Sequence, residues 1–256
     1  MHPTLDLYFI EMPVYTALVM LGAVVGVLVA YLYLRVRRIG QRRKFIDLAL
    51  VVFAAAWIGA RAYHVALNGE YYAARPDEIT QFGLGGLAMR GALIAGFVAL
   101  AIYAGMRRTS VWHFADAGAL GLTIGQAIGW TGALAHGANY GVVSESRIAQ
   151  DLPDLYGLIQ PRFPLQPAEI ILFVGLFVGL LFFATRQPRA GALFLAYLLI
   201  ASAANCALGF QRGDETVFVG ALRIDQIVDA TFAALALVGL VRYLTIAVPG
   251  QTLNAN

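Results

Sequence analysis

The sequence predicts an all-α protein in which seven helices cross a membrane as one integral domain over residues 1–256. Hydrophobic residues make up 60% of the 256-residue chain, charged residues make up only 13%, and the mean hydropathy is +0.71. These fractions exclude an ordinary soluble domain. Seven segments are long and apolar enough to cross about 30 Å of hydrocarbon, which takes about 20 helical residues. The basic residues gather at the ends of these segments, as membrane topology requires.

The seven predicted helices are runs of mostly apolar residues between polar, Gly-rich or Pro-rich connections. They extend from Val14 to Leu34, Asp47 to Leu67, Leu87 to Met106, His113 to Leu134, Ala168 to Thr185, Gly191 to Phe210 and Leu222 to Ile246. Prolines at positions 164 and 167 suit a rigid entry to the fifth helix. The third and fourth helices contain the small-residue stretches GALIAG and GALGLTIGQAIGWTGALAHG, which predict close helix packing.

The basic residues predict an N-terminus outside the cell and a C-terminus in the cytoplasm. Eleven of the eighteen Lys and Arg residues flank helix ends on one side, namely Arg35, Arg37, Arg38, Arg42, Arg43, Lys44, Arg107, Arg108, Arg186, Arg189 and Arg242. Five lie on the other side, namely Arg75, Arg147, Arg162, Arg212 and Arg223. The side richer in Lys and Arg faces the cytoplasm. Because the first thirteen residues contain no Lys or Arg, a cleaved signal peptide is not expected.

Two long outer connections hold the least lipid-like sequence. Residues 68–86 and 135–167 are rich in Gly, Pro and Tyr, and the second predicts a small extracytoplasmic lobe between the fourth and fifth helices. A single cysteine, Cys206, excludes an internal disulfide framework and a Cys-rich metal site. The chain also lacks GxxxxGK[ST], HExxH, CxxC and GxSxG, so we expect no metal ion and no cofactor. A net charge of +3, distributed along membrane boundaries, gives no reason to expect nucleic acid as a partner.

Two arginines fall inside predicted helices, where a charge costs several kcal/mol unless it has a partner or a polar cavity. Arg61 lies in IGARAYHV, three residues before His64 and on the same helix face. It could hold a lipid phosphate or extend toward the outer interface. Arg90 lies among glycines in GGLAMRGALIAG, where it could bind an anionic headgroup or form a structural ion pair.

Further polar residues gather where the chain reaches the outer interface. His136 could act as a base near neutral pH, or it could be a structural group. Glu169, in a first helical turn, has the alternative role of balancing the helix dipole. Neighbouring polar positions in the same regions are Asn139, Tyr140, Arg162, Gln166, Arg212, Asp214, Arg223, Asp225, Gln226 and Asp229.

Taken in order along the chain, several of these segments resemble the prolipoprotein diacylglyceryl transferase family, whose members are seven-helix bacterial inner-membrane enzymes. The resemblance covers nearly the whole chain and rests on the segments IGARAYHV, GGLAMRGALIAG, GWTGALAHGANYG, RFPLQPAE, FQRGDE and LRIDQ. They are similar to the family's Gly-x-Arg-Leu-x-Tyr, Gly-Gly-x-x-x-His-Gly-Gly-Leu, Gly-Arg-x-Gly-Asn-Phe-x-Asn-Gly-Glu-x-x-Gly, Arg-His-Pro-Ser-Gln-Leu-Tyr-Glu and Leu-Arg-Gly-Asp-Glu segments and its downstream Gln.

The resemblance implies that a diacylglyceryl group moves from phosphatidylglycerol to the lipobox cysteine thiol of a prelipoprotein, with release of glycerol phosphate. It implies His136 or Glu169 as the catalytic base. It implies a substrate-binding set of Arg61, Arg90, Asn139, Tyr140, Gly141, Arg162, Gln166, Arg212 and Gln226. It also implies a bacterial inner-membrane location, with phospholipid and a prelipoprotein peptide as partners.

The chain departs from the family pattern at several positions. Arg90 replaces the family's motif histidine, and further replacements lie at Trp130, Ala133, Ala138, Asn205 and Gly209. An alternative follows, in which the protein is a catalytically inactive relative that binds lipid or another membrane protein. A cavity joining Arg90 to His136 would favour the enzyme. A carboxylate partner for Arg90, together with Trp130 filling that cavity, would favour the inactive relative.

Overall fold

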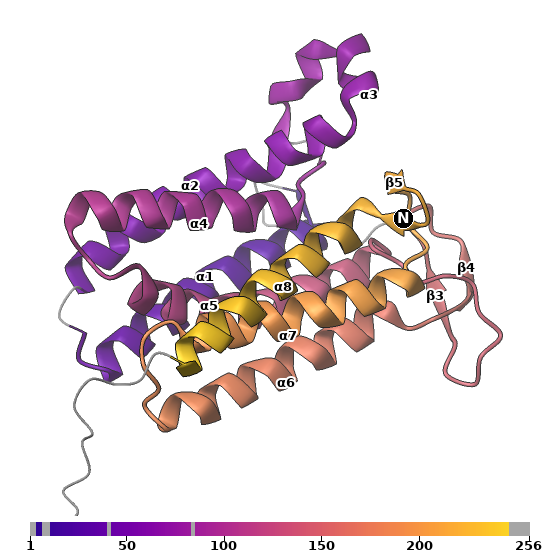
Figure 1. Cartoon of the computed structure of the whole chain (residues 1–256). Coiled ribbons are helices and arrows are strands. Elements are labelled where there is room, and N and C mark those ends of the chain that lie inside the picture. The colour runs from indigo at the N-terminus through magenta and orange to yellow at the C-terminus, as the bar shows by residue number, and fades with distance from the viewer. Residues whose placement is uncertain (1–3, 7–10, 40–41, 83–84, 246–256) are drawn as a thin grey trace, which may run out of the picture.

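The computed structural model describes residues 4–6, 11–39, 42–82 and 85–245, and in them the chain is all-α apart from short hairpins (Figure 1). Seven long helices form the body of the molecule. They are α1 (Val14–Val36), α2 (Arg42–Leu67), α4 (Met89–Arg107), α5 (Val111–His136), α6 (Leu165–Thr185), α7 (Ala192–Leu208) and α8 (Ile224–Thr245). Each corresponds to one predicted segment, although Ile246, the predicted end of the last helix, lies outside the described residues.

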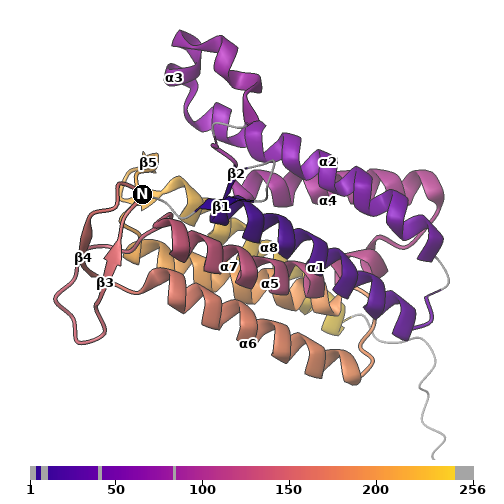
Figure 2. The same ribbon diagram turned by 180° about the vertical axis from the view of Figure 1, so that it is seen from behind.

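Six of these helices are long and apolar enough to cross a membrane. The exception is α5, which contacts α1, α6 and α7 (Figure 2). Because protein covers much of α5, its surface does not need the apolar character of a lipid-facing helix. The start of α2 also differs from the prediction, since the helix begins at Arg42 instead of Asp47. Its first turns are polar in sequence, yet Phe45 and Leu48 are buried in the core.

The core has two clusters of buried side chains. One joins the ends of α1, α2, α4 and α5 through residues such as Leu34, Phe45 and Phe114. The other lies between α5, α6 and α7 and includes Phe173 and Tyr197. Close van der Waals packing between these side chains holds the helices together.

Glycines set the distance between two helix pairs, as the small-residue stretches predict. A Cβ atom at Gly26 of α1 would lie 2.7 Å from the carbonyl oxygen of Gly121 of α5. Gly59 of α2 and Gly91 of α4 approach each other in the same way, because a Cβ at Gly59 would lie 2.8 Å from the Gly91 oxygen. The helices therefore pack backbone against backbone at these points.

The short elements gather at one end of the bundle, which we call the hairpin end. They are α3 (Gly69–Ala74), η1 (Pro76–Thr80), η3 (Gly209–Gln211), β1 (Thr4–Asp6), β2 (Glu11–Pro13), β3 (Gln150–Pro153), β4 (Ile159–Arg162), β5 (Phe218–Val219) and β6 (Leu222–Arg223). The strands form three separate antiparallel hairpins. The β3–β4 hairpin lies in the connection predicted as an outer lobe, and α3 projects from the end of α2 (Figure 1).

Candidate functional site

Most of the polar residues singled out by the sequence converge at the hairpin end. They come from the segments that follow α5, precede α6 and connect α7 to α8, and from the first turns of α6 and α8. Backbone hydrogen bonds connect these segments to one another. Val142 donates to the Gln211 carbonyl and Phe163 donates to the Val142 carbonyl, each at 2.9 Å, and Gly213 donates to the Tyr140 carbonyl at 2.9 Å.

Gly141 is required sterically at the centre of this junction. A Cβ atom there would collide with the carbonyl oxygen of Phe163. Gly213 is equally confined, because its Cβ would lie 2.8 Å from the Gly141 oxygen. The backbones of the three connections therefore touch directly at Gly141 and Gly213. Gly141 shapes the site by having no side chain.

Arg212 is the centre of the charged network in this junction. Its guanidinium donates to both Asp214 carboxylate oxygens, at 2.9 and 2.6 Å, and to Asn139 Oδ1 at 2.8 Å. Burial lowers the pKa of Arg212, but the hydrogen bonds and charge of Asp214 outweigh burial and raise this pKa above its ordinary value. Asn139 adopts a left-handed backbone conformation with φ 51°, which places its side chain toward Arg212.

Arg223 extends the network to the start of α8. Its guanidinium donates to the carbonyl and the carboxylate of Asp214, at 2.9 and 3.1 Å. Burial lowers the pKa of Arg223, and the charge of Asp214 only partly opposes that effect. One aspartate thus accepts from two arginines, so the connection between α7 and α8 is held from both sides.

Arg162 forms a second buried group with the β3–β4 hairpin. It donates to Asp154 at 2.9 Å and to Gln160 at 3.0 Å, and its guanidinium lies 4.7 Å from the centre of the Tyr140 ring. Burial and then the charge of Asp154 raise the pKa of Tyr140, while Arg162 opposes them. Asp154 also accepts from the backbone of Tyr156 and Leu158. Arg162 is therefore committed to holding the hairpin in place.

The two glutamines predicted as binding residues link backbone segments. Gln226 accepts from the Arg223 backbone and donates to the Cys206 carbonyl, both at 3.0 Å. Gln166 donates to the Ala138 carbonyl at 3.1 Å. The Gln166 Oε1 atom is buried and has no hydrogen-bond partner among the described residues. It is available to a donor that enters the site.

Glu169 offers the most reactive arrangement in this region. The residue is 2% exposed, and within the described part of the chain its Oε2 atom has no hydrogen-bond partner. The charges of Arg212 and Arg90 act on its carboxyl group. A buried carboxylate with an open oxygen can accept a proton, and the two guanidinium groups that act on it are each paired with an aspartate.

Arg90 forms the structural ion pair that was one of its two predicted roles. Its Nη2 lies 2.6 Å from Asp229 Oδ2, and its Nη1 lies 3.3 Å from Asp225 Oδ2. The pair connects α4 to α8 across 139 residues of sequence. Asp225 and Asp229 are four residues apart and share one face of α8, which was the signal for this partnership.

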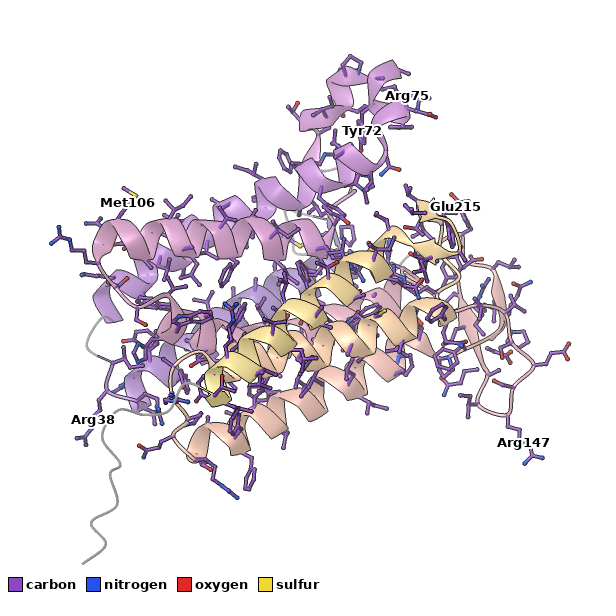
Figure 3. All side chains as sticks on the ribbon, in the orientation of Figure 1. Arg38, Tyr72, Arg75, Met106, Arg147 and Glu215 are labelled. Carbon is purple, nitrogen blue, oxygen red and sulfur yellow. The ribbon has the colours of Figure 1, made fainter. Side chains whose placement is uncertain are left out.

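Arg61 extends into the outer connection that follows α2. It is 3% exposed and donates to backbone carbonyls of Ile79, at 2.9 Å, and Gly85, at 2.6 Å, as well as to Glu78 and Gly86. Its guanidinium also lies 5.2 Å from the Tyr72 ring centre. Arg61 therefore holds the segment that includes α3 and η1 (Tyr72 and Arg75 in Figure 3) against the end of α2.

His136 lies in the last turn of α5 and stacks on Tyr15 of α1. The ring centroids are 5.6 Å apart and the planes are inclined by 21°. Gly137, with φ 72°, then ends the helix. Trp130, six residues earlier in α5, packs against the core cluster between α5, α6 and α7. Across residues 4–6, 11–39, 42–82 and 85–245, no group of three or more His, Cys, Asp or Glu side chains could hold a metal ion.

Comparison with known proteins gives one consistent result. The family model described as prolipoprotein diacylglyceryl transferase matches residues 4–242. A phosphatidylglycerol–prolipoprotein diacylglyceryl transferase of Thermosynechococcus vestitus is 33% identical over 248 residues, which cover 93% of this chain and 91% of the relative. Proteins of the same name from Symbiobacterium thermophilum and Geobacillus kaustophilus are 32% and 34% identical, over 78% and 79% of this chain and 77% of each relative.

Proposed function

Because the chain belongs to the prolipoprotein diacylglyceryl transferase family, we propose that it transfers a diacylglyceryl group from phosphatidylglycerol to a prelipoprotein cysteine. The names of its relatives support both substrates. The six apolar helices and the family support a multi-pass membrane protein. We place it in a bacterial inner membrane, with α5 as a seventh span, the hairpin end outside and the C-terminus in the cytoplasm.

The observation that carries this proposal is the open, buried carboxylate of Glu169 beside the charges of Arg212 and Arg90. In the proposed reaction, Glu169 accepts the thiol proton and the cysteine sulfur attacks the glyceryl carbon of the lipid. A carbon–sulfur bond forms, the carbon–oxygen bond to phosphate breaks, and glycerol phosphate leaves with the electron pair. Arginine side chains stabilise the phosphate as it leaves.

Arg90 contributes to this reaction only if the lipid phosphate replaces a carboxylate on its guanidinium. Asp229 and Asp225 occupy two of its nitrogen atoms. The guanidinium of Arg212 is bound to one carboxylate, that of Asp214, and to one side-chain amide, that of Asn139. We therefore assign proton acceptance to Glu169 in preference to His136, which stacks on Tyr15.

A second candidate function is lipid or protein binding without transfer. The ion pairs of Arg90 favour it, because a guanidinium already neutralised by carboxylates attracts a phosphate less strongly. Trp130 favours it as well, because its large ring packs against the core cluster between α5, α6 and α7. In this alternative the hairpin end keeps its shape and its lipid contacts but does not form the carbon–sulfur bond.

Reconstitution separates the two functions. The purified chain is placed in phosphatidylglycerol vesicles with a lipobox peptide, and mass spectrometry follows the diacylglyceryl mass increment on the peptide. We expect product, and we expect Glu169→Gln to slow its formation by about 10²-fold or more, as for loss of a general base. Arg147→Gln, on the exposed outer loop, is the matched control and should keep the full rate.

One result would count against the transferase assignment, and another would count only against Glu169 as its base. Absence of product, while the Thermosynechococcus relative works in parallel, would favour the binding function. Product formation at an unchanged rate by Glu169→Gln would keep the transferase activity but remove Glu169 as its base, and His136→Gln would then be compared.

A further inference from the structure

The end of the bundle opposite the hairpins contains a cavity of about 500 Å³ that the proposed reaction does not use. Three segments line it: the end of α1 with the residues after it, the start of α5, and the end of α6. Its lining includes Val36, Arg37, Arg38, His113, Thr185 and Gln187. Because α1 has 23 residues, its two ends are about 35 Å apart. The cavity is therefore separate from the site at Glu169 and Arg212.

The charge of this cavity is of one sign. Arg37, Arg38 and His113 line it, and no acidic residue does. Within the described parts of the chain, none of these three side chains takes part in an ion pair. The neighbouring Asp116 is already bound, because it accepts from the backbone of Gly191 at 2.7 Å and of Phe194 at 2.9 Å. The cavity is thus suited to an anion.

The other groups in the lining suit a phosphate. The Gln187 amide and the two guanidinium groups are donors, and arginine forks match pairs of phosphate oxygens. Arg38 extends from this end of the molecule (Figure 3), where its long side chain can turn toward a ligand. The N-terminus of α5, which begins at Val111, adds the positive end of a helix dipole close to His113.

Exposed apolar residues lie in the cavity wall and along α6. Val36, in the cavity wall, is 78% exposed, and Phe182, one turn before Thr185, is 64% exposed. Farther along α6, Val178 and Ile171 are also exposed. A soluble anion would make no contact with these apolar residues, whereas the acyl chains of a lipid would cover them.

We call the end of the bundle opposite the hairpins the basic end. We propose that this cavity binds the phosphate of an anionic phospholipid from the leaflet at the basic end, with the acyl chains along α6. A bound headgroup would connect the ends of α1, α5 and α6, three helices whose opposite ends carry the candidate reaction site. This binding is independent of diacylglyceryl transfer, so it can be present whichever function the hairpin end performs.

The test measures lipid retained by the full-length protein. The protein is purified in a neutral detergent, titrated with phosphatidylglycerol, and examined by native mass spectrometry. The variant Arg37→Gln/Arg38→Gln should lose one tightly bound lipid. Its apparent affinity should fall about fivefold for each arginine removed, or about 25-fold for the pair. Arg107→Gln/Arg108→Gln, equally basic at the same end but outside the cavity, is the matched control and should bind like the wild type.

A second variant keeps the charge, and therefore the topology, unchanged. Ala184 lines the cavity, and Ala184→Trp should place an indole ring in it and exclude the same bound lipid. Equal lipid loss in both arginine pairs would indicate a general surface charge and overturn the proposal. Full retention of lipid by Ala184→Trp would also overturn it. Displacement of the lipid by millimolar inorganic phosphate at equal ionic strength would identify a site for a free anion instead of a lipid.

Discussion

Arg90 shows how a residue that is unfavourable in a membrane becomes part of a stable fold. Its side chain is only 13% exposed, and its partner Asp229 is 7% exposed. Taking such charges out of water is costly, and removal of one partner leaves the other charge unpaired. Loss of either residue should therefore lower stability more than the intact pair raises it. The contact between α4 and α8 needs both residues.

A double-mutant cycle tests this dependence. Arg90→Met and Asp229→Asn should each lower the free energy of unfolding. The double variant should lose less than the sum of the two, with a coupling free energy of about 1–3 kcal/mol. The measurement is thermal or denaturant unfolding of the four proteins in one detergent. Additive effects of the two substitutions would show that the 2.6 Å contact does not contribute to stability.

Arg61 illustrates the opposite solution to the same problem, because among the described residues its hydrogen bonds go to backbone carbonyls and to no carboxylate. Its guanidinium binds carbonyl groups of Glu78, Ile79, Gly85 and Gly86. These groups lie 11 to 19 residues beyond the end of α2 at Leu67, and their conformation cannot be read from the helix pattern. A basic residue inside an apolar segment was the correct signal of a special role, but the partners depended on how the outer connection folds.

At the scale of elements, helix pairs are positioned by the absence of side chains. Gly22 and Gly26 of α1 face Gly125 and Gly121 of α5, four residues apart on each helix. Spacing by four keeps these glycines on one face, so the two backbones approach along a continuous strip. The α1–α5 contact is the most direct connection between the N-terminal helix and the centre of the bundle.

Two glycines of α5 make a matched test of this packing. A Cβ atom at Gly121 would collide with the Gly26 carbonyl, whereas a Cβ at Gly118 would meet no atom within 4 Å. Gly121→Ala should therefore lower the free energy of unfolding by about 1–3 kcal/mol. Gly118→Ala should leave stability unchanged or raise it slightly, since alanine favours helix. Equal melting temperatures for the two variants would contradict close packing at Gly121.

The start of α7 depends on another helix for its cap. Asp116 of α5 accepts from the backbone of Gly191 and Phe194, the groups that a helix N-terminus leaves without internal partners. The residue that precedes α7 is Gly191 itself, with φ 98°, so no local side chain performs this task. A long-range contact thus decides where α7 begins.

At the scale of the whole molecule, α2 and α4 form a pair to one side of the other five long helices (Figures 1 and 2). At the basic end, the core cluster around Phe45, Tyr103 and Phe114 joins this pair to α1 and α5. At the hairpin end, the pair meets α8 through Arg90 and its carboxylates. An apolar contact at one end and a charged contact at the other therefore fix the position of the pair.

The same two ends predict the orientation in the membrane. Arg147 and Glu215 lie at the hairpin end and Arg38 at the opposite end (Figure 3). In a Cys206→Ser background, Ser146→Cys should react with an impermeant thiol reagent added to intact cells. Thr185→Cys should react only after permeabilisation, because the end with more Lys and Arg faces the cytoplasm. The reverse labelling pattern would overturn the proposed topology.

The pattern of apolar and polar residues alone predicts the all-α class, the number and positions of the long helices and the segments that carry the polar residues. A helix in an apolar environment must satisfy its backbone within itself, so about 20 apolar residues in a row already specify it. The glycine pattern further indicated close packing, because the lack of a side chain is a property of the residue alone.

Which polar groups meet depends on how the helices pack in three dimensions. Arg90 and Asp229 are 139 residues apart, and Asn139 and Arg212 are 73 apart, so no local period connects them. The same holds for Glu169, whose type suggested a base while its open carboxylate oxygen depends on how the neighbouring segments pack. Two charged groups interact only when the packing of the helices brings them close together. That packing is the sum of many weak contacts between segments, so no single segment contains it.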